Sequence, residues 1–184
     1  YADFLKNNEK FTASIKLYTE LLDKIEPNHS LFPQVLEGRG VSYERLGKWK
    51  KAEKDLLASL EASPEQAYVI NYLAYSWIEQ GVKIEQSLEM LQQANKLKAN
   101  DPYIIDSLGW AFYKLKKFKE AKKYLQTAVE LMPADPIVND HFGDVLWKNG
   151  KKIQARYYWN YVLKLKDTKE EQKKVIEEKL ILGL

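Results

Sequence analysis

Two histidines are the first side chains to consider for acid–base or metal chemistry in this sequence. His141 directly follows Asp140 and precedes Asp144 by three residues. A histidine between carboxylates is a set that can bind a metal ion or act as a general base. Asp140 and Asp144 are four residues apart and share one face of a helix, whereas His141 points partly elsewhere. We therefore expect no metal site there, and we interpret His29 as an ordinary histidine of a solvated loop.

The other requirements of catalysis are not visible in the sequence. The chain has no cysteine, and it contains neither a Cys–His metal spacing nor a glycine-rich phosphate loop. An enzyme also needs its reactive groups gathered in a pocket, and we expect no pocket that gathers two titratable groups. The sequence therefore predicts a protein that is not an enzyme, with no catalytic residue, no cofactor and no metal ion.

Charge is nearly balanced along the chain. There are 29 Lys and Arg residues against 26 Asp and Glu residues, and the two signs are largely interspersed, so we predict no nucleic-acid partner. The densest basic cluster is the run 114–119, followed by Lys122 and Lys123. Aromatic residues within it are few, which favours a solvated rim over a surface for an anionic partner or a membrane.

The sequence does not determine the cellular compartment of the protein. No apolar run reaches the roughly 18 to 20 residues of a membrane span. Absence of cysteine fits both the cytoplasm and a bacterial periplasm. The chain begins with Tyr1-Ala2-Asp3, without methionine and already in a helical pattern, so we expect it to be a piece of a longer protein.

Local start and stop signals divide the chain into helices. Asp101-Pro102 and Asp135-Pro136 each place a capping carboxylate before a proline in the first helical position, and Ser63-Pro64 is a weaker case. Gly47, Gly81 and Gly150 stand where a first helix must end in a left-handed turn. The predicted first helices are 33–46, 67–80, 102–115 and 136–149. Their partners are 49–61, 84–98, 118–131 and 152–166.

Further helices are expected at both ends of the chain. Residues 11–25 indicate a second helix, and 1–6 indicate the end of its partner. A final helix over 168–182 begins with Thr168 and Glu171, the spacing of a capping box. It is mostly charged, which suits a terminal helix whose outer face contacts water.

A pattern that returns every 34 or 35 residues relates these helix pairs. Gly40, Ala74, Gly109 and Gly143 form one column of small residues. Ala52, Ser87, Ala121 and Ala155 form another, and the aromatic residues Tyr43, Trp77 and Phe112 belong to a third. Small residues let the paired helices approach closely, and the aromatic rings fill the space between them. A fixed period of this size predicts stacked helical units.

These columns resemble the tetratricopeptide repeat, and the best copy has Leu108-Gly109, Phe112, Ala121, Ala128 and Pro133. The resemblance implies an all-α fold, a right-handed superhelical α-solenoid of antiparallel helix pairs with a C-terminal capping helix. It divides the chain into a partial repeat 1–32, the repeats 33–66, 67–101, 102–135 and 136–167, and the capping helix 168–184.

The resemblance also implies that the first helix of each pair lines a concave groove. By register, the groove residues are Tyr68, Asn71, Tyr72, Tyr75, Tyr103, Asp106, Trp110, Tyr113, Asp140, Asp144 and Trp147. This set is aromatic and acidic, and it suits a protein or peptide with apolar and basic anchors. The alternative is that these aromatic residues pack against adjacent helices or against missing parts of the protein.

We therefore predict a protein-interaction scaffold. The Lys, Asn and Arg clamp that chaperone-binding members of the family use for a free carboxylate is absent, because Glu37, Val41, Tyr72, Tyr103 and Ser107 occupy its positions. A second hypothesis is a structural module that self-associates or braces another domain. It is motivated by the apolar end of the chain, residues 180–184.

Overall fold

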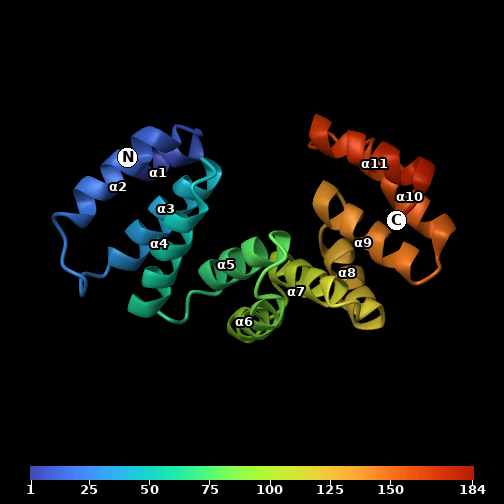
Figure 1. Ribbon diagram of the computed structural model, residues 1–184, viewed down its shortest axis with the longest axis horizontal. Helices are drawn as coiled ribbons and strands as arrows, with labels where there is room; N and C mark the ends of the chain where they lie inside the picture. Colours follow the sequence, from blue (N-terminus) through green and yellow to red (C-terminus); the bar gives the residue numbers. More distant parts are fainter. The chain divides into compact units, whose positions relative to one another are not determined.

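The computed structural model describes all residues from 1 to 184 and contains eleven helices and no strand (Figure 1). The helices are α1 (Ala2–Asn7), α2 (Phe11–Leu22), α3 (Phe32–Arg45), α4 (Trp49–Ala62), α5 (Ala67–Glu79), α6 (Ile84–Leu97), α7 (Pro102–Lys114), α8 (Phe118–Leu131), α9 (Pro136–Lys148), α10 (Lys152–Val162) and α11 (Glu170–Leu182). They form two compact units, Tyr1–Leu73 and Ala74–Leu184, which we call unit 1 and unit 2.

The predicted helix ends are confirmed where the signal is local. Asp101 accepts hydrogen bonds from the backbone N–H groups of Tyr103 and Ile104 at 3.1 and 3.2 Å. Asp135 caps α9 in the same way at 2.9 and 3.0 Å. Gly47, Gly81 and Gly150 have φ of 70°, 70° and 77°, the left-handed conformation that lets a helix end without a steric penalty.

Two predicted caps are wrong. Ser63 is the C-cap residue of α4 and does not begin the next helix, which starts at Ala67. Thr168 does not cap α11 either. Its hydroxyl donates to the carbonyl oxygen of Val162 at 2.6 Å, and Lys169 stands at the N-cap without a side-chain hydrogen bond. Thr168 thus closes the turn after α10, which ends at Val162, four residues earlier than predicted.

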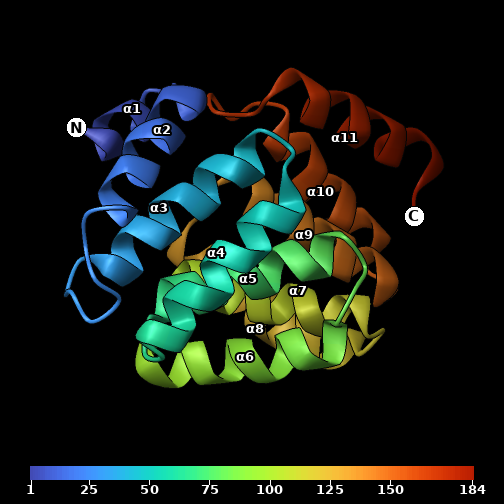
Figure 2. The ribbon, with the colours of Figure 1, turned by 60° about the vertical axis from the view of Figure 1, so that its left-hand side comes forward.

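Unit 1 is held by close packing and by polar contacts between its helices. Figure 2 shows α3 and α4 lying side by side. A Cβ at Gly38 of α3 would collide with the ring of Tyr18 on α2. The hydroxyls of Ser14 and Ser42 share a buried hydrogen bond of 2.9 Å.

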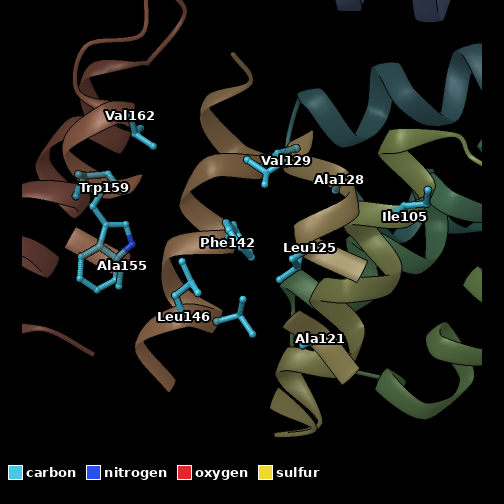
Figure 3. Packing of buried hydrophobic residues seen from close by; sticks show 13 residues of the cluster. Ile105, Ala121, Leu125, Ala128, Val129, Phe142, Leu146, Ala155, Trp159 and Val162 are labelled. Carbon is cyan, nitrogen blue, oxygen red and sulfur yellow. The ribbon is translucent and has the colours of Figure 1, made fainter. Parts of the chain in front are cut away.

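The core of unit 2 is built by α7, α8, α9 and α10. In Figure 3, Phe142 and Leu146 of α9 lie between residues of α8, such as Leu125, and residues of α10, such as Trp159. Leu125 and Trp159 have no exposed surface. Ala121 and Ala155, from the predicted small-residue column, are also fully buried, as expected for positions that receive a neighbouring side chain.

The column of glycines allows the paired helices of unit 2 to approach closely. A Cβ at Gly109 would lie 2.7 Å from Cγ and 3.1 Å from the backbone nitrogen of Leu125. A Cβ at Gly143 would collide with the indole of Trp159. These contacts confirm the predicted role of the column.

Replacing Gly109 with leucine is expected to destabilise unit 2 by about 1–3 kcal/mol or more, because α7 and α8 must separate to admit the side chain. Urea denaturation followed by circular dichroism measures the loss. Tyr103→Leu, at a position of the same helix that is 58% exposed, is the control and is expected to stay within about 0.5 kcal/mol of wild type. Equal stability of the two variants would contradict close packing at Gly109.

The last helix, α11, runs beside α9 in the same direction. The amide of Gln172 donates to the carbonyl of Pro136 at 3.1 Å, near the start of both helices. The carbonyl of Leu184 accepts from the indole of Trp147 at 3.1 Å, near their ends. The position of α11 is therefore that of a further first helix, although Glu177 stands 34 residues after Gly143, where the preceding first helices carry glycine or alanine.

Candidate protein-binding surface

Four aromatic rings from three helices of unit 2 meet on one surface. The indole of Trp110 on α7 stacks on the imidazole of His141 on α9, with ring centroids 3.9 Å apart. The ring of Tyr113 is also stacked on Trp110, at 4.6 Å, and the ammonium of Lys114 lies 4.9 Å from the centroid of the same indole. Tyr75 on α5 is tilted against His141 at 6.4 Å. We call these four residues the ring stack.

Carboxylates hold the ring stack in place. The Nε1 atom of Trp110 donates to Glu79 at 2.7 Å. Nδ1 of His141 lies 3.0 and 3.1 Å from the two carboxylate oxygens of Asp106. Burial lowers the pKa of His141, but the charge and hydrogen bond of Asp106 outweigh it, so the pKa lies above its ordinary value of 6.5. Folding therefore favours the imidazolium form relative to the unfolded chain, and this form makes a buried ion pair with Asp106 between α7 and α9.

This ion pair predicts a pH dependence of stability. A raised histidine pKa contributes stability that is complete below pH 6.5 and is lost as pH rises through the raised value. Asp144 acts in the same direction at lower pH, because its pKa is raised from 3.8 to about 6. We expect the urea midpoint of unit 2 to fall as the pH increases above about 6.5.

The variant His141→Gln should flatten this part of the profile, because it removes the titrating group. His29→Gln, in an exposed loop, is the matched control and should keep the wild-type slope. The same slope for His141→Gln and wild type between neutral and mildly basic pH would contradict the assignment.

A second polar cluster lies where α9 meets α11. Nζ of Lys179 lies 2.5 Å from Asp140 and 2.8 and 2.9 Å from the two oxygens of Asp144. Asp144 also accepts a hydrogen bond from the indole of Trp159 at 3.0 Å. Burial and the neighbouring charge of Asp140 raise the pKa of Asp144 to about 6, against the lowering effect of Lys179. Burial lowers the pKa of Lys179, but the two carboxylates outweigh it and raise the pKa above 10.5.

Trp147 lies at the end of the same face of α9. Gly183 packs directly on its indole. The guanidinium of Arg156 and the ammonium of Lys152 lie 4.9 and 5.1 Å from its ring centroid. The ring is partly exposed, and two cations of the chain itself already lie against it.

The predicted groove residues differ in exposure. Tyr68 and Tyr103 are 50% and 58% exposed, and the side chains of Tyr72, Tyr75, Tyr113, Asp140 and Trp147 are partly buried, as is Asn71. Asp106, Trp110 and Asp144 are only 6%, 7% and 4% exposed. All three pack against adjacent helices. For Trp110 this is what the alternative interpretation proposed for the aromatic residues, whereas the burial of the two carboxylates was not expected.

Tyr68, Asn71 and Tyr72 belong to unit 1, whereas the other predicted groove residues belong to unit 2. In unit 1, the hydroxyl of Tyr72 donates to Glu44 of α3 at 2.6 Å. The ring stack and the cluster around Asp144 bring most of the unit 2 residues together.

Register also placed His141 on the groove face, but sequence reasoning missed Glu79 and Lys179 as members of this surface. Glu79 and His141 stand 31 and 35 residues from their partners Trp110 and Asp106. Contacts at about one repeat period are the signal that could have found them, because successive first helices run side by side. Lys179, 35 residues after Asp144, obeys the same spacing.

No group of three or more metal-ligating side chains is present, and no helix is both long and apolar enough to cross a bilayer. One cavity of about 340 Å³ opens between α8, α9 and α10, and its lining includes Lys122, Glu130 and Tyr158. The expectation that no pocket would gather two titratable groups is therefore wrong. This cavity is lined by none of the residues of the ring stack.

The sequence profile of the tetratricopeptide repeat matches residues 33–168. The chain therefore belongs to the tetratricopeptide repeat family, whose proteins bind other proteins or peptides. The TPR repeat-containing protein PA4667 of Pseudomonas aeruginosa is 28% identical over 123 residues, which are 67% of this chain and 20% of that protein. The chain thus spans about a fifth of the length of this curated relative.

Solved structures are similar to the whole chain. TTC0263, a thermophilic TPR protein of Thermus thermophilus, has a TM-score of 0.76 at 16% identity, over 98% of this chain and 96% of that chain. YrrB, described as a TPR protein with an unusual peptide-binding site, has a TM-score of 0.68 at 16% identity, over 96% of this chain and 88% of that chain. With the all-helical structure, these similarities confirm the predicted tetratricopeptide solenoid fold.

Proposed function

We propose that unit 2 binds a segment of another protein on the face that carries the ring stack. The observation that carries this proposal is the stack itself, in which the buried rings of Trp110 and His141 lie between the half-buried rings of Tyr113 and Tyr75. Tyr103 and Ile137 are 58% and 51% exposed. They lie seven residues before Trp110 and four residues before His141, so each shares a helix face with a member of the ring stack. We call Tyr75, Tyr103, Tyr113, Ile137 and Asp140 the ring-stack face.

Rigid aromatic side chains favour such a role. Tyrosine and tryptophan offer a large contact area and lose little entropy on binding. Here stacking and the hydrogen bond to Glu79 already fix the ring of Trp110, so little further ordering is needed. Lys179 pairs with both Asp140 and Asp144, so this pair of carboxylates exceeds its single ammonium and leaves negative charge at one side. This charge suits a partner with apolar and basic residues.

The test selects random phage-displayed peptides on the full chain and measures the enriched peptides by fluorescence anisotropy. We expect enrichment of lysine or arginine beside aromatic or aliphatic residues. The double variant Tyr103→Ala, Ile137→Ser should weaken binding by about tenfold or more, since both residues are exposed and truncation does not disturb the core.

Tyr157→Ala is the control, because Tyr157 is 68% exposed on α10 and lies outside the face. Binding that is unchanged in the double variant, or equally weakened in the control, rejects the ring-stack face. Trp110 is unsuitable for this test, because its removal would leave a cavity beside His141.

A second candidate function, self-association or bracing of another domain, is favoured by the end of the chain. Ile181 and Leu182 are 77% and 82% exposed. Sedimentation of the wild type and of the double variant Ile181→Ser, Leu182→Ser at several concentrations tests it. A concentration-dependent mass that the variant lacks supports self-association, and a monomer in both cases rejects it.

A further inference from the structure

The C-terminal helix supplies the kind of anchor that the proposed function expects from a partner. Lys179 places its ammonium group between Asp140 and Asp144 at 2.5 to 2.9 Å. Beyond it, the backbone at Gly183 packs on Trp147, and the carbonyl of Leu184 accepts from its indole. Lys179 of α11 and Gly183, directly after the helix, thus contact Asp140, Asp144 and Trp147 of α9.

Few apolar side chains attach α11 to the rest of unit 2. Ile176 is the one residue of the helix that is buried, and Leu180 is partly buried against the same core. Val175, Ile181 and Leu182 are 48%, 77% and 82% exposed. A helix with few buried apolar contacts opens at a lower free energy than the core does.

The charges of Asp140 and Asp144 determine which kind of segment can bind beside α9. The side chains of Asp140, Asp144 and Lys179 are 15%, 6% and 11% exposed. If α11 left and nothing replaced it, Asp140 and Asp144 would face each other without a cation, which disfavours the open state. A neutral or acidic segment would leave them unpaired, whereas a lysine-bearing helix restores the pairing.

We propose that α11 is an exchangeable ligand of its own chain, and that Asp140, Asp144 and Trp147 are the subsite for a lysine-bearing helical segment of a partner protein. Partner binding at this subsite displaces α11. The segment carries an apolar residue three positions before the lysine and a small residue four positions after it, as Ile176, Lys179 and Gly183 do. This inference rests on the proposed function, since it names a partner of the same unit, but it uses residues outside the ring-stack face apart from Asp140.

The experiment uses the full chain and a fluorescein-labelled peptide with the sequence of residues 169–184. The double variant Ile176→Ser, Lys179→Met loosens α11 in the chain. We expect it to bind the peptide at least tenfold more tightly than wild type does, because its subsite is open. A peptide with Lys179→Met should bind the same variant at least tenfold more weakly. Equal binding by the two chains, or by the two peptides, overturns the proposal.

Hydrogen exchange of the wild type provides a measurement that needs no variant. We expect the amides of α11 to exchange at least tenfold faster than those of α9, and equal protection would overturn exchangeability. Adding Tyr103→Ala and Ile137→Ser to the loosened chain separates the two proposals. If this chain binds the 169–184 peptide as well as the loosened chain does, the α11 subsite is distinct from the ring-stack face, even if that face fails its own test. Loss of peptide binding would contradict a distinct subsite.

Discussion

Replacing Trp159 with alanine is expected to lower the free energy of unfolding of unit 2 by about 3–5 kcal/mol. Trp159 has no exposed surface, and it lies on the face of α10 that packs against α9. Glycine at position 143 leaves room for this ring, because a Cβ there would collide with the indole. Alanine would leave a cavity that the closely packed α9 and α10 cannot fill by moving together.

Two further variants separate packing from hydrogen bonding. Trp159→Phe keeps most of the ring but loses the hydrogen bond to Asp144, and we expect a cost of about 1.5–3 kcal/mol. Tyr157→Ala, two residues earlier and 68% exposed, should change stability by less than about 0.5 kcal/mol. Urea denaturation monitored by circular dichroism gives all three values. A loss for Trp159→Ala no larger than that for Tyr157→Ala would refute the packing described for α9 and α10.

Replacing Asp55 with alanine is expected to destabilise unit 1 by about 3 kcal/mol. Asp55 is 5% exposed, and it accepts hydrogen bonds from Nε and Nη2 of Arg39 at 2.7 and 2.9 Å. The variant leaves a guanidinium that cannot lose its proton, with a side chain that is 19% exposed. The remaining bond of Arg39 to Thr19, at 3.2 Å, does not neutralise the charge.

The surface pair Glu170–Lys173 provides the control. The Glu170 side chain is 78% exposed, so Glu170→Gln should cost less than about 0.5 kcal/mol. The double variant Arg39→Met, Asp55→Leu should recover most of the lost stability, because apolar residues can replace a buried pair. If the double variant is as unstable as Asp55→Ala, the unpaired charge is not the cause.

The chain's fold and most of its helix ends are predictable from the sequence because their causes are local or periodic. Asp101 and Asp135 cap helices whose first residue is proline, and the caps need only the next three residues. The period of 34 or 35 residues indicates which helices pair, and the small column containing Gly109 and Gly143 indicates where they cross. Thr168 shows the limit of this reasoning, because its hydroxyl has a carbonyl acceptor on the preceding helix.

Exposure of the groove residues is less predictable. Register places Asp106 and Trp110 on the inner face of α7 and Asp144 on the corresponding face of α9, but it does not say which side chains of a neighbouring helix lie against them. Trp110 is covered by His141, and Asp144 by Lys179. A chain with a different residue at either covering position would have the same repeat pattern and a more accessible face.

By itself, the sequence determined the class of fold, the pairing of helices and the aromatic and acidic character of the first helices, since these depend on short spacings and on one repeat period. Tertiary structure alone decided that the carboxylates are paired inside the protein and that α11 lies beside α9. The physical reason is that burial and ion pairing arise between side chains of different repeats. Which of these groups face water therefore depends on the packed helices rather than on the residues considered one repeat at a time.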